Sequence, residues 1–273
     1  MKKLLTFVFV LAYFLVPTMA NGQMTFWLPG HVGLYGPQLV IGGGYRTDVT
    51  ITNVSSTPTQ VVLSFGMQDG STLLVKLTDA RFPQLFWNST GYNPGGIPPG
   101  GSVQVTLTSP SLTPVVGSLG AIITRSVSGQ NAVQVSMQYS YAPYGTVLGQ
   151  AAVSVNEPSM GFGFHAVRSI EPDQDELRTG VAITNATGRT ANLTFRGRNR
   201  MGQEVASFPL TIVPYGQIAK FLGEMTTLPS NWSGGLVEVT SDVPIAGMTL
   251  QTTVNMEGNF TFSSGTTFPL PQN

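Results

Sequence analysis

Hydrophobic and polar residues alternate along most of this chain. In one representative run, the apolar residues Val49 and Ile51 are each followed by a threonine. Successive residues of a β-strand point to opposite faces, so a period of two predicts strands with one buried face. Clusters of turn residues, such as 53–58, separate these runs. Short alternating strands between turn clusters are typical of an all-β sandwich, which is the fold class we expect.

The alternating pattern occurs in two copies along the chain. The segment Arg46–Asn53 (RTDVTITN) recurs as Arg178–Asn185 (RTGVAITN), 132 positions later. Further matches keep the same order, and their offset falls to 115 and then to 113. We therefore expect two tandem immunoglobulin-like antiparallel β-sandwich domains, spanning residues 24–156 and 157–273. Within the repeat, Asp48 of the first copy takes the place of a glycine in the second.

The fall in offset from 132 to 115 places an insertion of 17 residues in the first copy, at about 76–96. Its aromatic residues include Phe86, Trp87 and Tyr92, for which the second copy has no counterpart. Loops on a rigid sandwich often carry binding residues, and such rings stack on sugars or anchor partners. We therefore predict these three as ligand-binding residues. The alternative is that they cover an open end of the sandwich, so exposed rings would favour binding and buried rings would favour packing.

Two runs carry a resemblance to a known type of module. They are GGGYRTDVTITN…PPGGSVQVTL in the first copy, and LRTGVAITN…VPYGQIAKFLGEM…GGLVEVTSDVPIAGMTL in the second. Together they resemble an immunoglobulin-like module that recurs, commonly in tandem, in exported proteins of environmental bacteria. The resemblance implies a short helical turn at Phe-Leu-x-Glu and a hairpin in the last run, but no catalytic residues. We expect the helical turn at 219–225.

The first twenty residues have the composition of a secretory signal. Lys2 and Lys3 precede an apolar run from Leu4 to Val16, and small residues lead up to Ala20. This order predicts a signal peptide over 1–20 that is cleaved after Ala20. No later apolar stretch is long enough for a membrane span. The mature chain is therefore expected in the periplasm or outside the cell.

Composition and charge exclude several kinds of function. The chain has no cysteine, which excludes disulfides, cysteine-ligated metals and thiol catalysis. Removal of the signal lowers the basic residues from 13 to 11 against 13 acidic ones, a net charge of −2. A nearly neutral chain lacks the basic surface that nucleic-acid binding requires, so no nucleic-acid partner is expected.

Three arginines alternate near the middle of the second copy. Arg196, Arg198 and Arg200 would share one face of a strand, opposite Leu193 and Phe195. One interpretation is an anion-binding stripe for acidic polysaccharide or lipid headgroups. The other is a charged solvent face that prevents the strand from pairing with another molecule.

Other polar and aromatic groups favour structural roles. The two histidines, His31 and His165, lie at similar distances before the repeated segment, which predicts a shared place in the fold. Tyr139, Tyr141 and Tyr144 are expected to pack along strands. The acidic residues Glu171, Asp173, Asp175 and Glu176 lack the glycine and distal glutamate of a calcium loop. We predict no metal site and no cofactor.

The motifs of common hydrolases are missing from the sequence. It has no Gly-x-Ser-x-Gly elbow and no His-Glu-x-x-His zinc motif. We therefore expect a non-catalytic, exported structural or interaction protein of the bacterial cell envelope or matrix, adhesion-like, with a glycan or another envelope protein as its partner. One alternative is a carbohydrate-binding protein that uses the insertion. A further alternative, a glycan-active enzyme, requires a convergent pair of carboxylates.

Overall fold

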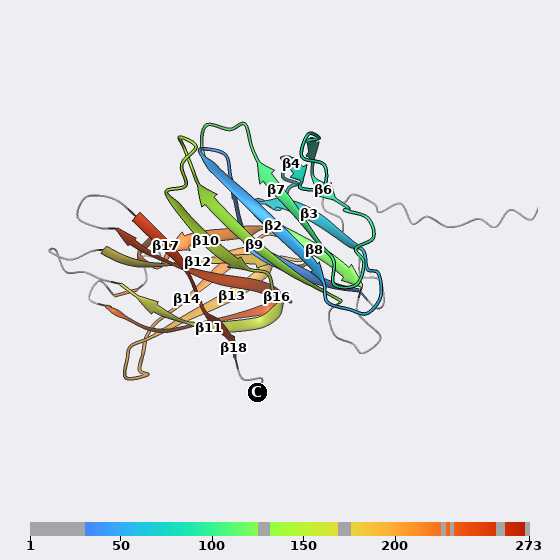
Figure 1. Cartoon of the computed structure of the whole chain (residues 1–273). Helices are drawn as coiled ribbons and strands as arrows, with labels where there is room; N and C mark the ends of the chain where they lie inside the picture. The colour runs from blue at the N-terminus through green and yellow to red at the C-terminus, as the bar shows by residue number, and fades with distance from the viewer. Residues whose placement is uncertain are drawn as a thin grey trace, which may run out of the picture.

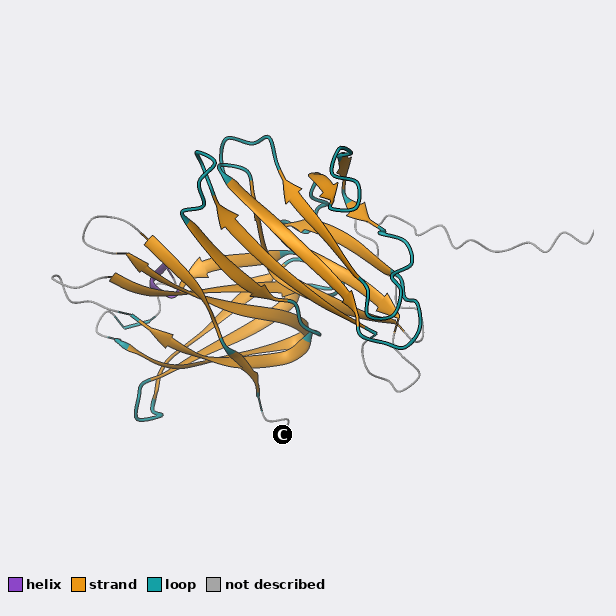
Figure 2. Ribbon diagram, in the orientation of Figure 1, coloured by secondary structure: helices purple, strands orange, loops and turns teal. Residues whose placement is uncertain are grey.

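The computed structural model describes residues 31–124, 132–168, 176–224, 228–229, 232–254 and 260–270. Within these ranges the chain forms antiparallel β-sheets, and the one helical element is the 3-10 turn η1 (Leu222–Glu224), purple in Figure 2. The expected all-β class is confirmed. No helix among the described residues has the length and apolar character to cross a membrane. The predicted signal peptide, 1–20, lies outside the described residues.

The N-terminal half (31–154) consists of two sheets packed face to face (Figure 1). Its strands are β1 (His31–Ile41), β2 (Tyr45–Asn53), β3 (Val61–Met67), β4 (Val75–Asp79), β5 (Trp87–Ser89), β6 (Gly91–Tyr92), β7 (Ser102–Thr108), β8 (Val115–Thr124), β9 (Val133–Tyr141) and β10 (Gly149–Ser154). One sheet has the order β1-β8-β3-β6, and the other has the order β10-β9-β2-β7-β4-β5. Alternate residues of both sheets, Phe65 and Ile51 among them, are buried between the sheets in one core.

The C-terminal half (159–270) is one continuous sheet folded around a second core. Its strands are β11 (Ser159–Val167), β12 (Glu176–Asn185), β13 (Ala191–Arg198), β14 (Glu204–Ile212), β15 (Gln217–Phe221), β16 (Gly234–Val254), β17 (Phe260–Gly265) and β18 (Thr267–Pro269). The 21-residue β16 joins the two layers. Its first part pairs with β11 and β13, and its second part pairs with β12 and β17. The hairpin that the resemblance implies here is therefore wrong, because one strand passes from layer to layer.

The repeated segment ends in an asparagine that makes the same bonds in both copies. The side-chain amide nitrogens of Asn53 and Asn185 each donate to the carbonyl four residues ahead, at 2.7 and 2.6 Å. Asn53 also donates to the carbonyl of Ile97 (2.8 Å), and Asn185 donates to that of Val213 (3.0 Å). Both side chains are buried. Each therefore fixes a loop and a distant strand end at once, which gives a physical reason for the repeat.

The second residue of the repeat also has a duplicated role. The hydroxyl of Thr47 donates to the carbonyl of Val40 at 2.7 Å and accepts from its amide at 3.2 Å. Thr179 makes the same two bonds to Val167, at 3.1 and 3.0 Å. A threonine side chain thus bridges two strand ends that lack a full ladder of main-chain bonds.

The two halves share buried contacts. Ala182 of β12 and Met248 of β16 belong to the hydrophobic core of the N-terminal half, while Val181 and Ile183 of β12 face the other core. The sheet formed by β12, β15 and the end of β16 is therefore covered on both faces. The domain boundary predicted after residue 156 stays a prediction. The main chain of Asn156 exchanges two hydrogen bonds with Tyr35 of β1, at 2.8 and 3.0 Å.

The short helix expected over 219–225 is wrong for its first residues. Ala219 and Phe221 belong to β15, where they pair with Ala182 and Gly180 of β12. The helical turn is limited to η1, and residue 225 lies outside the described residues. Pairing with β12 satisfies main-chain groups that would otherwise be left unbonded at a sheet edge, so the sheet contact overrides the local pattern.

Candidate functional site

The insertion crosses the open side of the N-terminal sandwich. After β4 it turns back, and β5 pairs with β4 at the edge of the six-stranded sheet. The chain then reaches the opposite sheet, where β6 pairs with β3 at Leu63 and Ser64. One short segment therefore links the edges of both sheets, and its path places its side chains at the boundary between core and solvent.

A buried carboxylate holds the base of the insertion. The side chain of Asp79 is 0% exposed and accepts hydrogen bonds from Nη2 of Arg81 at 2.6 Å and from Nε at 3.0 Å. It also accepts from the main-chain amide of Arg81 at 2.8 Å and from the hydroxyl of Tyr92. Arg81 in turn donates to the carbonyl of Pro94 at 2.8 Å. Both ends of the insertion are thereby tied to one group.

These bonds change the acidity of the groups involved. Burial alone would raise the pKa of the Asp79 carboxyl, but the hydrogen bonds from Arg81 and Tyr92 outweigh it and hold this pKa below its usual value. Burial first, and then the bond to Asp79, raises the pKa of the Tyr92 phenol. At neutral pH the foot of the insertion therefore holds an ionised carboxylate between a guanidinium and a neutral phenol.

The tip of the insertion exposes four large apolar side chains. Phe82 is 50% exposed, Leu85 54%, Phe86 63% and Trp87 38%, and we name these four residues the aromatic surface. The ammonium of the neighbouring Lys76 lies 4.2 Å from the ring centroid of Phe86. The guanidinium of Arg81 lies 5.7 Å from that of Phe82. Cations over aromatic faces fix the rings while leaving area open to solvent.

The three predicted ligand-binding residues have different environments. Phe86 is mostly open to solvent. Tyr92 is partly buried and bonded to Asp79, and its ring centroid lies 6.1 Å from that of Trp87. Trp87 pairs with the fully buried Leu77 across β4 and β5, so its side chain is on the inward face at the edge of the sheet. Tyr92 is thus packed at the base of the insertion, Phe86 lies in the aromatic surface, and Trp87 does both. Ligand binding by these three residues stays a prediction.

The arginine stripe is shorter than predicted. Arg196 and Arg198 end β13, but Arg200 lies in the turn that follows, so the prediction of a shared strand face is wrong for Arg200. Arg198 donates from Nε and Nη2 to Glu238 on the neighbouring β16, both at 3.2 Å. Its charge is therefore already paired. Anion binding by this stripe stays a prediction.

The histidines occupy different strand registers. His31 pairs with Thr124, whereas Val239, the position that matches Thr124 in the second copy, pairs with Phe162 rather than with His165. The exposed ring of His165 lies 5.9 Å from that of Phe268. Among the described residues, no group of three or more His, Asp or Glu side chains is placed to hold a metal ion.

The structure confirms part of what was predicted for the three tyrosines and leaves the acidic residues undescribed. Tyr139 is buried and lies edge-on to Tyr45, with ring centroids 6.4 Å apart, and Tyr141 lies 4.6 Å from the same ring. Packing is thereby confirmed for these two residues, but it is wrong for Tyr144, which is 92% exposed. The acidic residues at 171, 173 and 175 lie outside the described residues, as does the side chain of Glu176.

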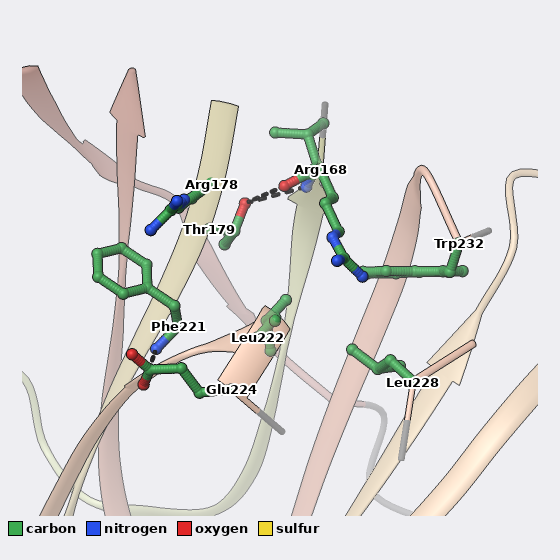
Figure 3. A pocket seen from close by; sticks show the side chains of 10 residues that line it. Arg168, Arg178, Thr179, Phe221, Leu222, Glu224, Leu228 and Trp232 are labelled. Atoms are coloured by element: carbon green, nitrogen blue, oxygen red, sulfur yellow. Dashed lines mark hydrogen bonds between the residues drawn. The ribbon is translucent and has the colours of Figure 1, made fainter. Parts of the chain in front are cut away.

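A cavity in the C-terminal half was not predicted from the sequence. It has a volume of about 250 Å³ and lies where the ends of β11 and β12 meet η1 (Figure 3). Arg168, Arg178, Phe221, Glu224 and Trp232 contribute to its lining. The one feature of the sequence that pointed to this cavity was the glycine at position 180. It takes the place that Asp48 has in the first copy, and it lies next to these residues in the fold.

Comparison with known proteins assigns no family. No family model matches the chain, and no curated protein matches it. Among solved structures, the pilus adhesin SpaC from Lactobacillus rhamnosus GG aligns at 9% identity over 76% of this chain, with a TM-score of 0.16. The alignment spans 25% of that chain. A TM-score of this size does not indicate a shared fold, so the match gives this protein no function.

Proposed function

We propose that this chain is a non-catalytic, exported interaction protein of the bacterial cell envelope or matrix, adhesion-like, that acts by surface contact through the aromatic surface. The observation that carries the proposal is the exposure of Phe82, Leu85, Phe86 and Trp87 above the ion pair of the buried Asp79 with Arg81. Clustered exposed apolar groups are typical of contact sites. Because the bonds of Asp79 and Arg81 hold the foot of the insertion in place, binding removes less conformational entropy.

The ligand class that this surface fits best is a glycan, which makes the protein carbohydrate-binding. Phe86 offers an open ring face, and the neighbouring Trp87 exposes part of its indole. Lys76 and the exposed Asn88, which are paired across β4 and β5, supply hydrogen-bonding groups beside the rings. Sugar rings present apolar C–H faces edged by hydroxyls, so they match aromatic faces edged by polar groups.

A glycan array probed with the full mature chain tests this function. Phe86→Ala and Trp87→Ala remove rings from the aromatic surface, and Tyr144→Ala removes an even more exposed ring from outside it. We expect the wild type and Tyr144→Ala to retain the same glycans, and both surface variants to lose them with unchanged thermal stability for Phe86→Ala. Absence of any retained glycan on the wild-type array would contradict the glycan proposal.

A further inference from the structure

Three loops of the N-terminal half meet at one end of its sandwich. They join β1 to β2, β7 to β8 and β9 to β10, and they span residues 42–44, 109–114 and 142–148. The main-chain amide of Gly43 donates to the carbonyl of Ser111 at 2.8 Å, and the carbonyl of Gly44 accepts from the amide of Ala142 at 2.8 Å. The short β1–β2 turn thus binds the other two loops together, and Figure 1 shows the loops after β7 and β9 projecting at the same end.

The tips of the two longer loops expose large apolar side chains. Leu112 is 96% exposed and Tyr144 is 92% exposed, which makes them the two most exposed large hydrophobic residues in the described part of the chain. Val147 and Leu148, on the same loop as Tyr144, are also exposed. We name these four residues the tip surface. Clustered exposed apolar groups mark contact sites with proteins or membranes.

The tip surface stands on loops without charge. None of the three loops contains an aspartate, glutamate, lysine or arginine. The first charged residue beyond the β1–β2 turn is Arg46, and its Nε lies 3.3 Å from the carboxylate of Asp48. Transfer of a charge into an apolar medium is costly, and these loops carry no charge that such a transfer would have to desolvate. A charged partner would find no group to pair with in the loops themselves.

The main chain of the 109–114 loop is bonded within the protein. The hydroxyl of Ser111 donates to the carbonyl of Thr113 at 2.7 Å and accepts from its amide at 3.2 Å. The amide of Ser111 donates to the hydroxyl of Ser109 at 3.2 Å. Pro110 and Pro114 have no amide hydrogen to satisfy. Polar main-chain groups that are bonded internally lose less when water is withdrawn from a loop.

The 142–148 loop has the same property in its first and last residues. The amide of Gly145 donates to the carbonyl of Ala142 at 3.2 Å, and the amide of Leu148 donates to the carbonyl of Tyr141 at 2.8 Å. Pro143 packs on the turn below, where a β-carbon on Gly44 would lie 2.7 Å from it. The loop is therefore held in place while the side chain of Tyr144 projects from it.

We infer that the tip surface binds a lipid bilayer, by shallow insertion of Leu112 and Tyr144 at the boundary between headgroups and acyl chains. Tyrosine is enriched at this depth, because its ring is apolar and its hydroxyl reaches water or headgroups. Irregular loops do not enter the hydrocarbon itself, so the insertion is limited to the projecting side chains. A fluid bilayer receives such side chains without a matching pocket, whereas a protein partner would have to supply one for each.

The aromatic surface is not part of this contact. Its most exposed ring, Phe86, lies 4.2 Å from the ammonium of Lys76, and insertion of that ring would desolvate the charge. Glycan binding at the aromatic surface and lipid binding at the tip surface are therefore tested with different variants.

Cosedimentation of the full mature chain with vesicles tests the inference. One set of vesicles is phosphatidylcholine, and the other contains phosphatidylglycerol as well. We expect binding to both with affinities within about twofold, and little change between about 0.1 M and about 0.5 M salt, because screening acts only on charges. No binding to phosphatidylcholine, or binding to the anionic vesicles alone, overturns the proposal.

Variants then locate the contact. Leu112→Ser and Tyr144→Ser should each weaken vesicle binding about tenfold, the effect of withdrawing one large apolar side chain from the lipid. Met201→Ser alters a side chain that is 85% exposed on the β13–β14 turn, and it should bind like the wild type, as should Phe86→Ala. Wild-type binding in the double variant Leu112→Ser with Tyr144→Ser overturns the proposal. A wild-type dimer that Leu112→Ser dissociates, without vesicle binding, would assign the tip surface to a second copy and overturn it as well.

Fluorescence distinguishes insertion from adsorption. Leu112→Trp places an indole at the tip, and its emission should shift to shorter wavelength when phosphatidylcholine vesicles are added. Met201→Trp, the matched control, should show no such shift. An unshifted emission from vesicle-bound Leu112→Trp would contradict insertion at this loop.

Discussion

The side-chain amide of Gln217 donates a hydrogen bond of 2.8 Å to the main-chain carbonyl of Pro37, 180 residues earlier in the chain. Gln217 is 2% exposed, and its own main-chain amide donates to the carbonyl of Gln68 at 3.1 Å. The start of β15 is therefore bonded to two separate segments of the N-terminal half. Together with the shared core contacts of Ala182 and Met248, this bonding makes the two halves one packed unit.

Replacement of Gln217 by alanine should weaken the contact between the halves. The change leaves the carbonyl of Pro37 buried without this donor, which costs about 1–3 kcal/mol of unfolding free energy. Gln104→Ala, on the exposed face of β7, should change the free energy by less than about 0.5 kcal/mol. Urea unfolding followed by fluorescence measures both variants. Equal stability of the two would show that the Gln217 bond does not join the halves.

The stability of the protein should fall steeply in alkaline solution because of Tyr35. Burial first, and then the nearby hydroxyl of Tyr215, raises the pKa of Tyr35 to about 12. An unfolded tyrosine titrates near pH 10. Because the folded pKa is the higher one, this stabilisation is complete below about pH 10 and is lost as the pH rises toward 12. The loss over that window is about 2–3 kcal/mol.

Urea unfolding at a series of pH values from 9 to 12 checks this contribution. Tyr35→Phe should show a shallower decline than the wild type, because phenylalanine has no proton to lose. Tyr144→Phe alters a tyrosine that is 92% exposed and should follow the wild-type curve. If Tyr35→Phe and the wild type declined in parallel, the hydroxyl of Tyr35 would have no role in the alkaline loss.

The duplicated asparagines should be among the most sensitive polar positions of the chain. Asn185→Ala removes the hydrogen-bond donor to the carbonyl of Val213 and to a carbonyl in the loop that follows Asn185. Asn53→Ala removes the donor to the carbonyl of Ile97. We expect each to lower the free energy of unfolding by about 2–4 kcal/mol, since several buried groups lose partners at once. Asn88→Ala, on the exposed face of β5, serves as the control in calorimetry. A melting temperature of Asn185→Ala equal to that of the control would refute this role.

Asp79 should make the insertion sensitive to acid. Its folded pKa is depressed, so its stabilisation is present above the unfolded value near 4 and is lost as the pH falls through the folded value. Asp79→Asn removes the charge opposite Arg81 and should cost on the order of 2–3 kcal/mol at pH 7, less than a fully buried pair because Arg81 is partly exposed. The variant should also show a flatter decline between pH 4 and pH 2.

Urea unfolding of Asp79→Asn across that acid range is the measurement. Asp69→Asn is the comparison, because Asp69 also has a pKa lowered by hydrogen bonds, to Ser71, but lies on the surface in a turn. It should cost less at pH 7 than the change at Asp79. An acid decline in Asp79→Asn as steep as that of the wild type would contradict the role given to this carboxylate.

The sequence was sufficient for features that rest on local pattern. Alternation predicted the buried and exposed faces of β2, and Val49 and Ile51 are fully buried as expected. The break in the repeat located the insertion, whose tip is exposed at Phe86. Each of these features depends on residues near one another in the chain, for which side-chain periodicity is informative.

Features that rest on distant contacts were missed. β15 forms because Ala219 and Phe221 pair with β12, and no local pattern contains that partner. The hydrogen bond from Gln217 to Pro37 likewise depends on how separate strands are packed. So does the cavity that Arg168 and Trp232 both line. The exchange of Asp48 for Gly180 was visible in the sequence, but its meaning required the knowledge that Phe221 lies opposite the glycine.

The dissociation constant of a glycan retained on the array, measured by calorimetry for four proteins, is the decisive test of glycan binding at the aromatic surface. The proteins are the wild type, Phe86→Ala, the double variant Phe86→Ala with Trp87→Ala, and Tyr144→Ala. We expect a loss of about tenfold or more for Phe86→Ala, a larger loss for the double variant, and wild-type affinity for Tyr144→Ala. Wild-type affinity in the double variant, with its fold intact by circular dichroism, would contradict the claim that the aromatic surface is the binding site.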